Sequence, residues 1–365
     1  MVDVLKEAIR FDVATAAIKG GRDYQEDSLI ANFPQGQDTG FAVLADGMGG
    51  HLSGDVASAL VMSEVFSEIK RKEFLLDKQI TDISALLYNT AMVANASVTQ
   101  HIAQQPDTYG MGSTLLACII RGDDLYWVSV GDSPLFLFRD GELRQLNQDH
   151  SMAPQIDMMV KVGAMDPEVG RNHPDRNTLT SAIAGEDLAK IDCPDTPTAV
   201  QPGDIIVVAS DGLQFLPNDR IADILRETQD QRSADMTEAL LAAIDDLGDP
   251  DQDNTAFTVI KLGARAQQAM TAPTDAAPVV QLHDNLVAMP PAAVEGATEP
   301  SVATTEERAP DAAQAPEPIG LPGKRIIRLV TSEALTFDTP MPDSHENAAP
   351  REPEDALGNW YRRQR

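Results

Sequence analysis

Cysteine and aromatic residues are scarce in this sequence of 365 residues. It contains 2 cysteines, and aromatic side chains make up 5% of it. Cys118 lies in an apolar run and Cys193 beside a proline, so the pair offers neither the spacing of a zinc site nor a disulfide framework. This cysteine usage fits a cytoplasmic protein.

Long apolar runs are also missing. No stretch reaches the ~20 apolar residues that a membrane-spanning helix needs. The first residues, MVDVLKEAIRFDV, do not combine a basic start with the apolar core of an export signal. We therefore expect neither membrane insertion nor export.

Positive charge is in short supply. Lys and Arg number 28 against 57 Asp and Glu, which gives a net charge of −29. Such a chain is repelled by nucleic acid and by anionic membrane surfaces, so we expect neither as a partner. We interpret the acidity as solubility together with a solvated tail, in preference to a specific electrostatic role.

The composition changes near Gly263. Before it, strand-like and helix-like patterns alternate; after it, Ala, Pro, Thr, Glu and Asp dominate. A segment of that kind buries too little apolar surface to offset the entropy lost on ordering. The sequence predicts a folded domain over residues 1–263 and a disordered tail over residues 264–365.

Two short segments interrupt the bias of the tail. Residues 324–337, KRIIRLVTSEALTF, have the alternation of a strand that adds to a partner or folds back, and a chance apolar patch is an equal reading. Residues 359–365, NWYRRQR, have the composition of a short docking peptide.

Apolar periodicity predicts the elements of the first domain. Helices are expected over residues 53–72, 82–104, 220–227 and 235–247, and strands over 11–18, 113–121, 124–130 and 135–139. Ser53 is a plausible N-cap, and Lys70 to Lys72 place positive charge at the end of that helix. Hairpin turns fall at RGDD and RDGE. This order fits an α+β fold of two packed antiparallel sheets with helices outside each.

Three aspartates stand where an apolar strand meets a turn. Asp46 and Asp211 end buried-looking runs and precede glycine, and Asp253 opens a strand. Each alone is compatible with ordinary turn chemistry, since Asp-Gly is common in turns. Together they predict a divalent metal site, because clustered carboxylates need cations. Nearby, RDYQED brings Arg22 among carboxylates, which indicates a site that holds phosphate beside metal ions.

Eight short motifs occur in the order seen in one enzyme family. They are RDYQEDS, FAVLADGMGGH, GMGSTL, VGDSPLF, QDHS, HPDRNTLTSAIAG, DIIVVASDGL and DNTAFTVI. Over residues 10–262 the chain resembles the metal-dependent serine/threonine protein phosphatases of the PP2C type, and DGMGGH and HPDRN look most like their bacterial branch. So many motifs in one order make a specific signal.

The resemblance implies a four-layer αββα sandwich, a monomer, and hydrolysis of phosphoserine and phosphothreonine in proteins, reversing a bacterial Ser/Thr kinase. It also implies two Mn²⁺ or Mg²⁺ ions that activate a water; oxygen-only ligation favours these metals over zinc. We expect Asp46 to bridge the ions, Asp211 and Asp253 to complete one, and the Gly47 carbonyl to bind the other. Glu26 and Asp27 are expected to act through metal-bound waters, and Arg22 to bind the phosphate.

Two assignments stay open. Bacterial members use an aspartate matching Asp132 for a third metal, and a turn aspartate explains that residue equally well. Animal members carry a proposed general acid where this chain has Met48, so the proton donor is undefined. His51 is expected to cap or pack against the glycine-rich turn, and water on a metal is the alternative donor.

Residues 148–184 correspond to the family's flap. Met152, Met158, Met159 and Met165 are interpreted as helix core, in preference to an adaptable surface for protein substrates. His173 and Arg176 are expected to order the flap. The main competing function is a catalytically silent binding module, which the presence of every expected carboxylate and of Arg22 disfavours.

Overall fold

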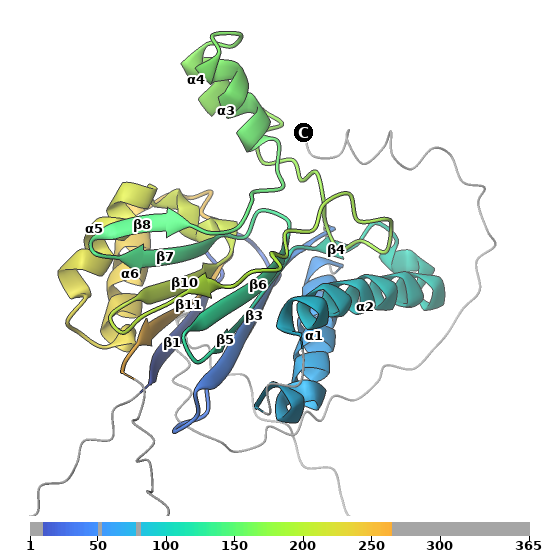
Figure 1. Ribbon diagram of the computed structural model, residues 1–365. Helices are drawn as coiled ribbons and strands as arrows, with labels where there is room; N and C mark the ends of the chain where they lie inside the picture. Colours follow the sequence, from blue (N-terminus) through green and yellow to red (C-terminus); the bar gives the residue numbers. More distant parts are fainter. Residues whose placement is uncertain (1–9, 50–52, 78–81, 265–365) are drawn as a thin grey trace, which may run out of the picture. The chain divides into compact units, whose positions relative to one another are not determined.

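The computed structural model describes residues 10–49, 53–77 and 82–264 of the chain (Figure 1). Its centre is a pair of antiparallel sheets. The first contains, in spatial order, β1 (Phe11–Ile18), β11 (Thr255–Leu262), β10 (Ile205–Ala209), β7 (Leu135–Arg139) and β8 (Glu142–Gln145). The second contains β2 (Asp27–Asn32), β3 (Thr39–Met48), β5 (Leu115–Arg121), β6 (Asp124–Val130) and β9 (Thr198–Ala199), with β4 (Gly112–Ser113) paired to the end of β3.

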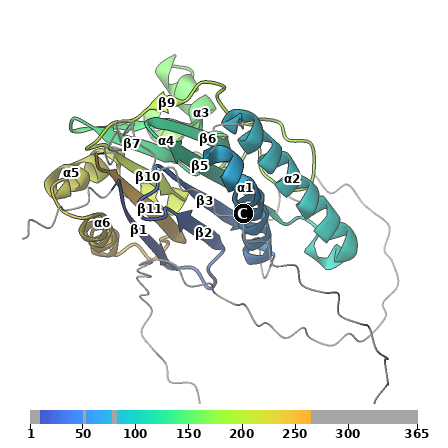
Figure 2. The same ribbon diagram turned by 60° about the horizontal axis from the view of Figure 1, so that its bottom comes forward.

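Helices cover the outer face of each sheet. The long helices α1 (Gly54–Asp77) and α2 (Ile83–Gln104) lie on the second sheet, and α5 (Asn218–Thr228) and α6 (Ser233–Leu247) lie on the first (Figure 2). Short 3-10 turns complete the elements, η1 (Pro106–Thr108) and η2 (Asp211–Phe215). The predicted αββα sandwich is confirmed for the described residues.

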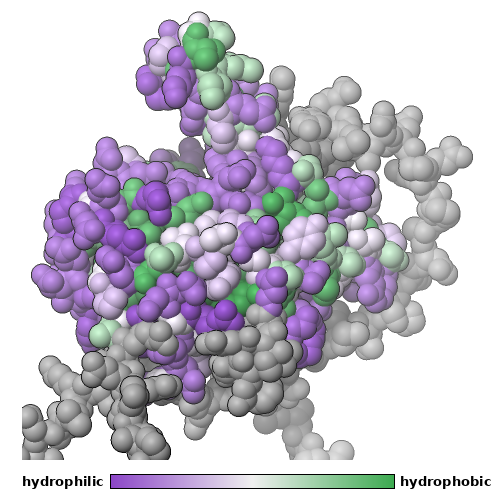
Figure 3. Space-filling model, in the orientation of Figure 1, coloured by the Kyte–Doolittle hydropathy of each residue, from purple (hydrophilic) through white to green (hydrophobic). Residues whose placement is uncertain are grey.

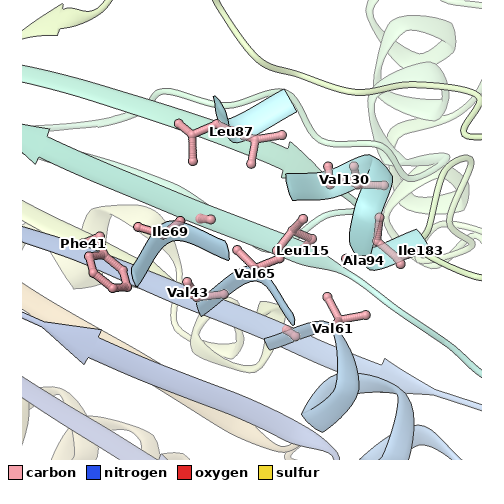
Figure 4. Close-up of a cluster of buried hydrophobic side chains, with 14 of the residues drawn as sticks. Phe41, Val43, Val61, Val65, Ile69, Leu87, Ala94, Leu115, Val130 and Ile183 are labelled. Carbon is pink, nitrogen blue, oxygen red and sulfur yellow. The ribbon is translucent and has the colours of Figure 1, made fainter. Parts of the chain in front are cut away.

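Three apolar layers hold the sandwich together. Between the sheets, Leu44, Leu116 and Ile206 interdigitate in a fully buried cluster. Beneath α1 and α2, Val43 and Leu115 of the second sheet pack against side chains of both helices (Figure 4). A third cluster lies beneath α5 and α6. The central strands are buried on both faces, as the continuous apolar runs of the sequence predict.

Helix α1 is longer than predicted. Its C-terminus is Asp77, so the expectation that Lys70 to Lys72 end it is wrong. Lys70 pairs with Glu73 at 2.7 Å, and Lys72 with Glu68 at 2.7 Å, each across one helical turn. Ion pairs at this spacing stabilise a helix, and both lysines lie inside α1 and not at its end.

The predicted strand over residues 113–121 is divided in two. β4 ends at Ser113, and β5 begins at Leu115. Thr114 interrupts them, and its Oγ1 accepts a hydrogen bond from the backbone N–H of Asp46 at 3.0 Å. The interruption therefore places a hydroxyl beside the aspartate at the end of β3.

The flap residues form a projecting pair of short helices, α3 (Ala153–Lys161) and α4 (Pro167–Arg171) (Figure 1). Met158 and Met159 are 56% and 46% exposed, so their interpretation as helix core is wrong. The reason is that α3 packs chiefly on α4 and buries chiefly Ile156. Apolar surface is visible on this projection in Figure 3.

Within the described part of the chain, no helix combines the length and apolar character needed to cross a bilayer. His51 and the tail segments 324–337 and 359–365 lie outside the described residues, as does nearly all of the predicted tail.

Candidate active site

Acidic side chains from both sheets gather at one edge of the sandwich. Asp27 opens β2, and its Cα is paired with that of Asp46 near the end of β3. In the other sheet, Asp211 follows β10 and Asp253 precedes β11, the strand paired with β10. Rigid, buried strands therefore fix four carboxylates that are far apart in the sequence.

The backbone of Asp46 is held by the segment that joins β4 to β5. The carbonyl oxygen of Asp46 accepts hydrogen bonds from the Thr114 N–H at 2.8 Å and the Ser113 hydroxyl at 2.9 Å. With the Thr114 hydroxyl receiving the Asp46 N–H, both backbone polar groups of this residue are satisfied. Because its backbone is anchored on both sides, Asp46 has little freedom to move away from its neighbours.

Ser210 connects the two sheets at this edge. Its hydroxyl is buried and donates to Asp27 Oδ2 at 2.8 Å, and it accepts the Ala256 N–H at 3.0 Å. The hydroxyl therefore links β2 in one sheet to β11 in the other, next to Asp211.

The loop between β1 and β2 is fastened by Asn254. Its side-chain Nδ2 donates to the carbonyls of Lys19 and Tyr24 at 2.8 and 2.9 Å, and its Oδ1 accepts the Glu26 N–H at 2.7 Å. This clamp brings Arg22 to the acidic edge, where its Nη2 donates to Asp253 Oδ2 at 2.5 Å. The Arg22 side chain remains 56% exposed.

Close backbone approach around Asp46 depends on Gly47 and Gly54. A Cβ on Gly47 would collide with the carbonyl oxygen of Gly54, and one on Gly54 would collide with the Glu26 carboxyl. The Gly47 N–H also donates to the Glu26 carbonyl at 3.0 Å. The absence of side chains at these two positions lets Glu26 lie beside the end of β3.

Burial and neighbouring charges raise the pKa values of three aspartates of this group. Burial raises the pKa of Asp27 to about 7, with Asp211 and Asp253 adding to the shift and hydrogen bonds from Ser210 and Asp46 opposing it. Burial likewise raises the pKa of Asp211 to about 6, assisted by Asp253 and opposed by a hydrogen bond with Asp46. The pKa of Asp46 is raised well above its ordinary value by burial and then by Asp27 and Asp211. Asp46 is paired with Asp27 across the two strands and faces the charges of Asp211, Asp132 and Asp253, so it lies at the centre of the group.

Asp132 belongs to the same acidic group. It follows β6, and its pKa is raised well above its ordinary value by burial first and then by the charges of Asp211 and Asp149. The turn before it is held by the buried imidazole of His150, whose Nδ1 accepts the Gly131 N–H at 3.3 Å. Burial lowers the pKa of His150, which keeps this ring neutral and able to accept.

The oxygen donors of the acidic edge suit a hard divalent cation. Asp27 Oδ1 is buried, with no hydrogen-bond partner in the structure. In the described residues, no three His, Cys, Asp or Glu side chains form a group already arranged around one ion. Buried, mutually repelling carboxylates with an unsatisfied oxygen are nevertheless the surroundings in which cations bind, and oxygen ligands select Mg²⁺ or Mn²⁺. The residues present fit such an ion.

The fold brings together every described residue that the sequence singled out for the site. Sequence reasoning missed the supporting groups Ser210, Thr114 and Asn254. Their polar side chains next to buried strands were a usable signal, since buried polar groups need partners. Asp149 was also missed as a charge beside Asp132, although it lies within the QDHS motif.

Comparison with known protein families matches a segment that lies within the span of the described residues. Residues 20–246 match the family described as protein phosphatase 2C. The chain belongs to the protein phosphatase 2C family. This membership confirms the predicted enzyme class, a serine/threonine protein phosphatase.

Bacterial members of the family are similar to the chain in sequence. A serine/threonine phosphatase, stp, of Listeria monocytogenes is 32% identical over 185 residues, covering 50% of this chain and 71% of the relative. The protein phosphatase PhpP of Streptococcus pneumoniae is 30% identical over 208 residues, covering 56% and 80%. These relatives agree with the predicted bacterial branch.

Solved structures agree with the fold. The serine/threonine phosphatase PstP/Ppp of Mycobacterium tuberculosis superposes with a TM-score of 0.55 at 28% identity, covering 70% of this chain and all of that one. A structure of the catalytic domain of PstP in complex with 2 manganese ions has a TM-score of 0.55 at 27% identity, covering 70% and 99%. Both comparisons leave the same share of this chain unmatched.

Proposed function

We propose that the protein hydrolyses phosphoserine and phosphothreonine in other proteins at the acidic edge of the sandwich, with the help of two divalent cations. The supporting observation is the convergence of Asp27, Asp46, Asp211 and Asp253 at one edge: Asp27 and Asp46 are paired across β2 and β3, Asp211 and Asp253 flank the paired strands β10 and β11, and Ser210 links the two sheets there. The manganese complex of a similar catalytic domain supports the same assignment.

The proposed ligands follow from position. Asp46, paired with Asp27 across β2 and β3 and facing the charge of Asp211, would bridge the two ions. Asp211 and Asp253 would complete one site and the Gly47 carbonyl the other, with Glu26 and Asp27 acting through water. Asp132 would serve a third ion. When bound, such cations lower the pKa of water and neutralise the phosphoryl oxygens.

Arg22 would bind and orient the substrate. Its guanidinium already stands at the acidic edge through Asp253, and its exposure leaves it accessible to a phosphate. A planar fork of donors matches two phosphate oxygens at once. The attacking water is thereby aligned with the phosphorus atom, because the phosphate is held in one orientation.

Phosphorylated proteins are the proposed substrates, in the cytoplasm and opposite a cognate Ser/Thr kinase. The similar bacterial proteins are described as serine/threonine phosphatases, which supports this substrate class. We further propose that the catalytic unit acts as a monomer, that it ends near residue 263, and that residues 264–365 serve recruitment.

The test is phosphate release from a phosphothreonine peptide, with and without Mn²⁺. We expect turnover only with the metal, and a loss of at least about a hundredfold for Asp46→Asn and for Asp211→Asn, since each removes charge that cations require. Asp219→Asn, at an exposed position on α5, is the matched control and should retain activity. A fully active Asp211→Asn enzyme would contradict the ligand assignment, and no turnover by the wild type would favour a silent binding module.

A further inference from the structure

Three segments of the candidate site meet at one buried residue that the proposed reaction does not use. Gln252 lies between α6 and β11, directly before Asp253, and is 6% exposed. Polar side chains of this size are rarely buried to this extent unless their hydrogen bonds are needed.

The side-chain amide of Gln252 joins the segments that carry Asp211 and Asp253. Its Nε2 donates to the Gly212 carbonyl at 3.0 Å and to the Thr255 hydroxyl at 3.0 Å, and it lies 3.3 Å from the Asp253 carbonyl. The reverse orientation of the amide would set Oε1 against two carbonyl oxygens, so the hydrogen-bond network supports this one.

The backbone at Gly212 is shaped for this contact. A Cβ there would collide with the Asn254 carbonyl and approach the Thr255 hydroxyl. The turn after β10 therefore lies directly against the start of β11, and the Gln252 amide bonds across that contact. The bond therefore joins the residue directly after Asp211 to the residue directly before Asp253.

The same residue also receives the loop that carries Arg22. The Gln252 carbonyl accepts the Gly21 N–H at 2.7 Å, and a Cβ on Gly20 or on Gly21 would collide with carbonyl oxygens of residues 250 to 253. Arg22 then reaches Asp253. One buried glutamine thus contacts all three segments.

The hydrogen bonds of this glutamine are made by its amide nitrogen and not by its amide oxygen. Its Oε1 is buried and accepts no hydrogen bond in the structure. An apolar side chain of the same length would avoid the cost of that acceptor, roughly 1–3 kcal/mol, but would remove the donor to the Gly212 carbonyl, so the contact across the turn is what the glutamine adds.

We infer that Gln252 is a positioning residue that sets the spacing of Asp211 and Asp253 and thereby the affinity of their edge of the site for a divalent cation. This inference rests on the proposed function. Groups that orient metal ligands typically contribute 10- to 100-fold to metal affinity or activity.

The experiment measures Mn²⁺ binding by titration calorimetry on the full chain without substrate. The variants are Gln252→Met, which keeps the length and removes the donors, and Gln252→Ala. Asn95→Ala is the matched control, because Asn95 is a similarly buried amide with two hydrogen bonds, to the Gly185 N–H and the Glu186 carbonyl. Thermal unfolding in chelator reports on folding without the metal.

We expect Gln252→Met to bind Mn²⁺ at least about tenfold more weakly than the wild type, with kcat recovering at saturating Mn²⁺. Asn95→Ala should bind Mn²⁺ as the wild type does, even if its unfolding temperature in chelator falls as much as that of Gln252→Met. Unchanged Mn²⁺ affinity in Gln252→Met would overturn the inference, and so would equal weakening in Gln252→Met and Asn95→Ala. Absence of Mn²⁺ binding by the wild type would instead overturn the proposed function, and the inference with it.

Discussion

At the scale of single residues, neutral polar groups hold the backbone of the site and the Asp27 carboxylate, while Arg22 pairs with Asp253. Ser210, Thr114 and Asn254 use hydroxyl and amide groups to bind backbone and carboxylate atoms at the acidic edge. Neutral partners hold a carboxylate in position without cancelling its charge. The charge of the aspartates is thereby kept for a cation.

Arg22 gives a prediction at this scale. Arg22→Lys keeps the positive charge but loses the planar fork, and Arg22→Ala loses both. We expect KM for a phosphothreonine peptide to rise about tenfold in the alanine variant and by less in the lysine variant, because uniform binding of the phosphate is lost. Steady-state kinetics at saturating Mn²⁺ measure both, and identical KM values in all three proteins would exclude phosphate binding by Arg22.

At the scale of elements, the site depends on where strands end. β3, β6 and β10 each carry an aspartate at or just beyond the same end of the sandwich, while β2 and β11 begin there. Antiparallel pairing explains this, since the end of one strand lies beside the start of its neighbour. The carboxylates of Asp27 and Asp253, 226 positions apart, therefore share one edge.

The flap is joined to this edge by backbone pairing. His150 receives hydrogen bonds on its carbonyl from the N–H and the hydroxyl of Thr180, at 2.6 and 2.8 Å. Further along, Ser113 and Ile183 exchange backbone hydrogen bonds at 2.8 and 3.0 Å. Across the projection, Arg176 binds both oxygens of Asp157 at 2.7 and 3.0 Å, which supports the prediction that it orders the flap.

Helix α2 gives the prediction at this scale. Asp82 accepts the Ala85 N–H at the N-terminus of the helix, and an N-cap of this type contributes about 0.5–2 kcal/mol. Asp82→Ala should lower the unfolding free energy by that amount, whereas Asp82→Asn should change it little, as measured by urea denaturation. Mn²⁺ affinity should be equal in both variants; a loss of affinity in Asp82→Ala would show that α2 supports the site.

At the scale of the whole molecule, the acidic edge works against folding when its carboxylates ionise. The pKa values of Asp27 and Asp211 are raised in the folded protein, to about 7 and about 6, from an ordinary value of 3.8. The folded state therefore holds more protons than the unfolded state between these values. Their stabilising contribution is present below about pH 4 and is lost as the pH rises through 6 and 7.

In chelator, the unfolding temperature should accordingly fall between pH 5 and pH 7.5, and Mn²⁺ should reduce that fall by replacing the protons. Differential scanning calorimetry measures both curves. Asp27→Asn removes one titrating group and should make the curve in chelator shallower, which separates this effect from general repulsion in an acidic chain. If the curves of unfolding temperature against pH in chelator are parallel for the wild type and Asp27→Asn, Asp27 does not contribute to the fall.

Removal of residues 264–365 is the second prediction at this scale. If the tail serves recruitment, hydrolysis of a small aryl phosphate should be unchanged within about twofold, since the described site draws on residues 22–254 alone. Activity on a full-length phosphoprotein is the complementary measurement. Loss of small-substrate activity would place part of the tail in the enzyme.

The sequence by itself determined the fold class, most element positions and the identity of the acidic residues. Strands 11–18, 124–130 and 135–139 were predicted at their observed bounds, because their apolar runs end at charged or turn residues. Asp46, Asp211 and Asp253 were recognisable for the same reason. These are local signals, carried by neighbours along the chain.

Only the tertiary structure decided which groups support those aspartates. The Gln252 amide, the Ser210 hydroxyl and the Thr114 hydroxyl act on residues 40 to 183 positions away, so a polar residue beside a buried strand can be recognised in the sequence but its partner cannot. The exposure of Met158 and Met159 was decided in the same way, since an apolar side chain is core only where another element covers it. Burial and hydrogen-bond partners come from contacts that the fold creates.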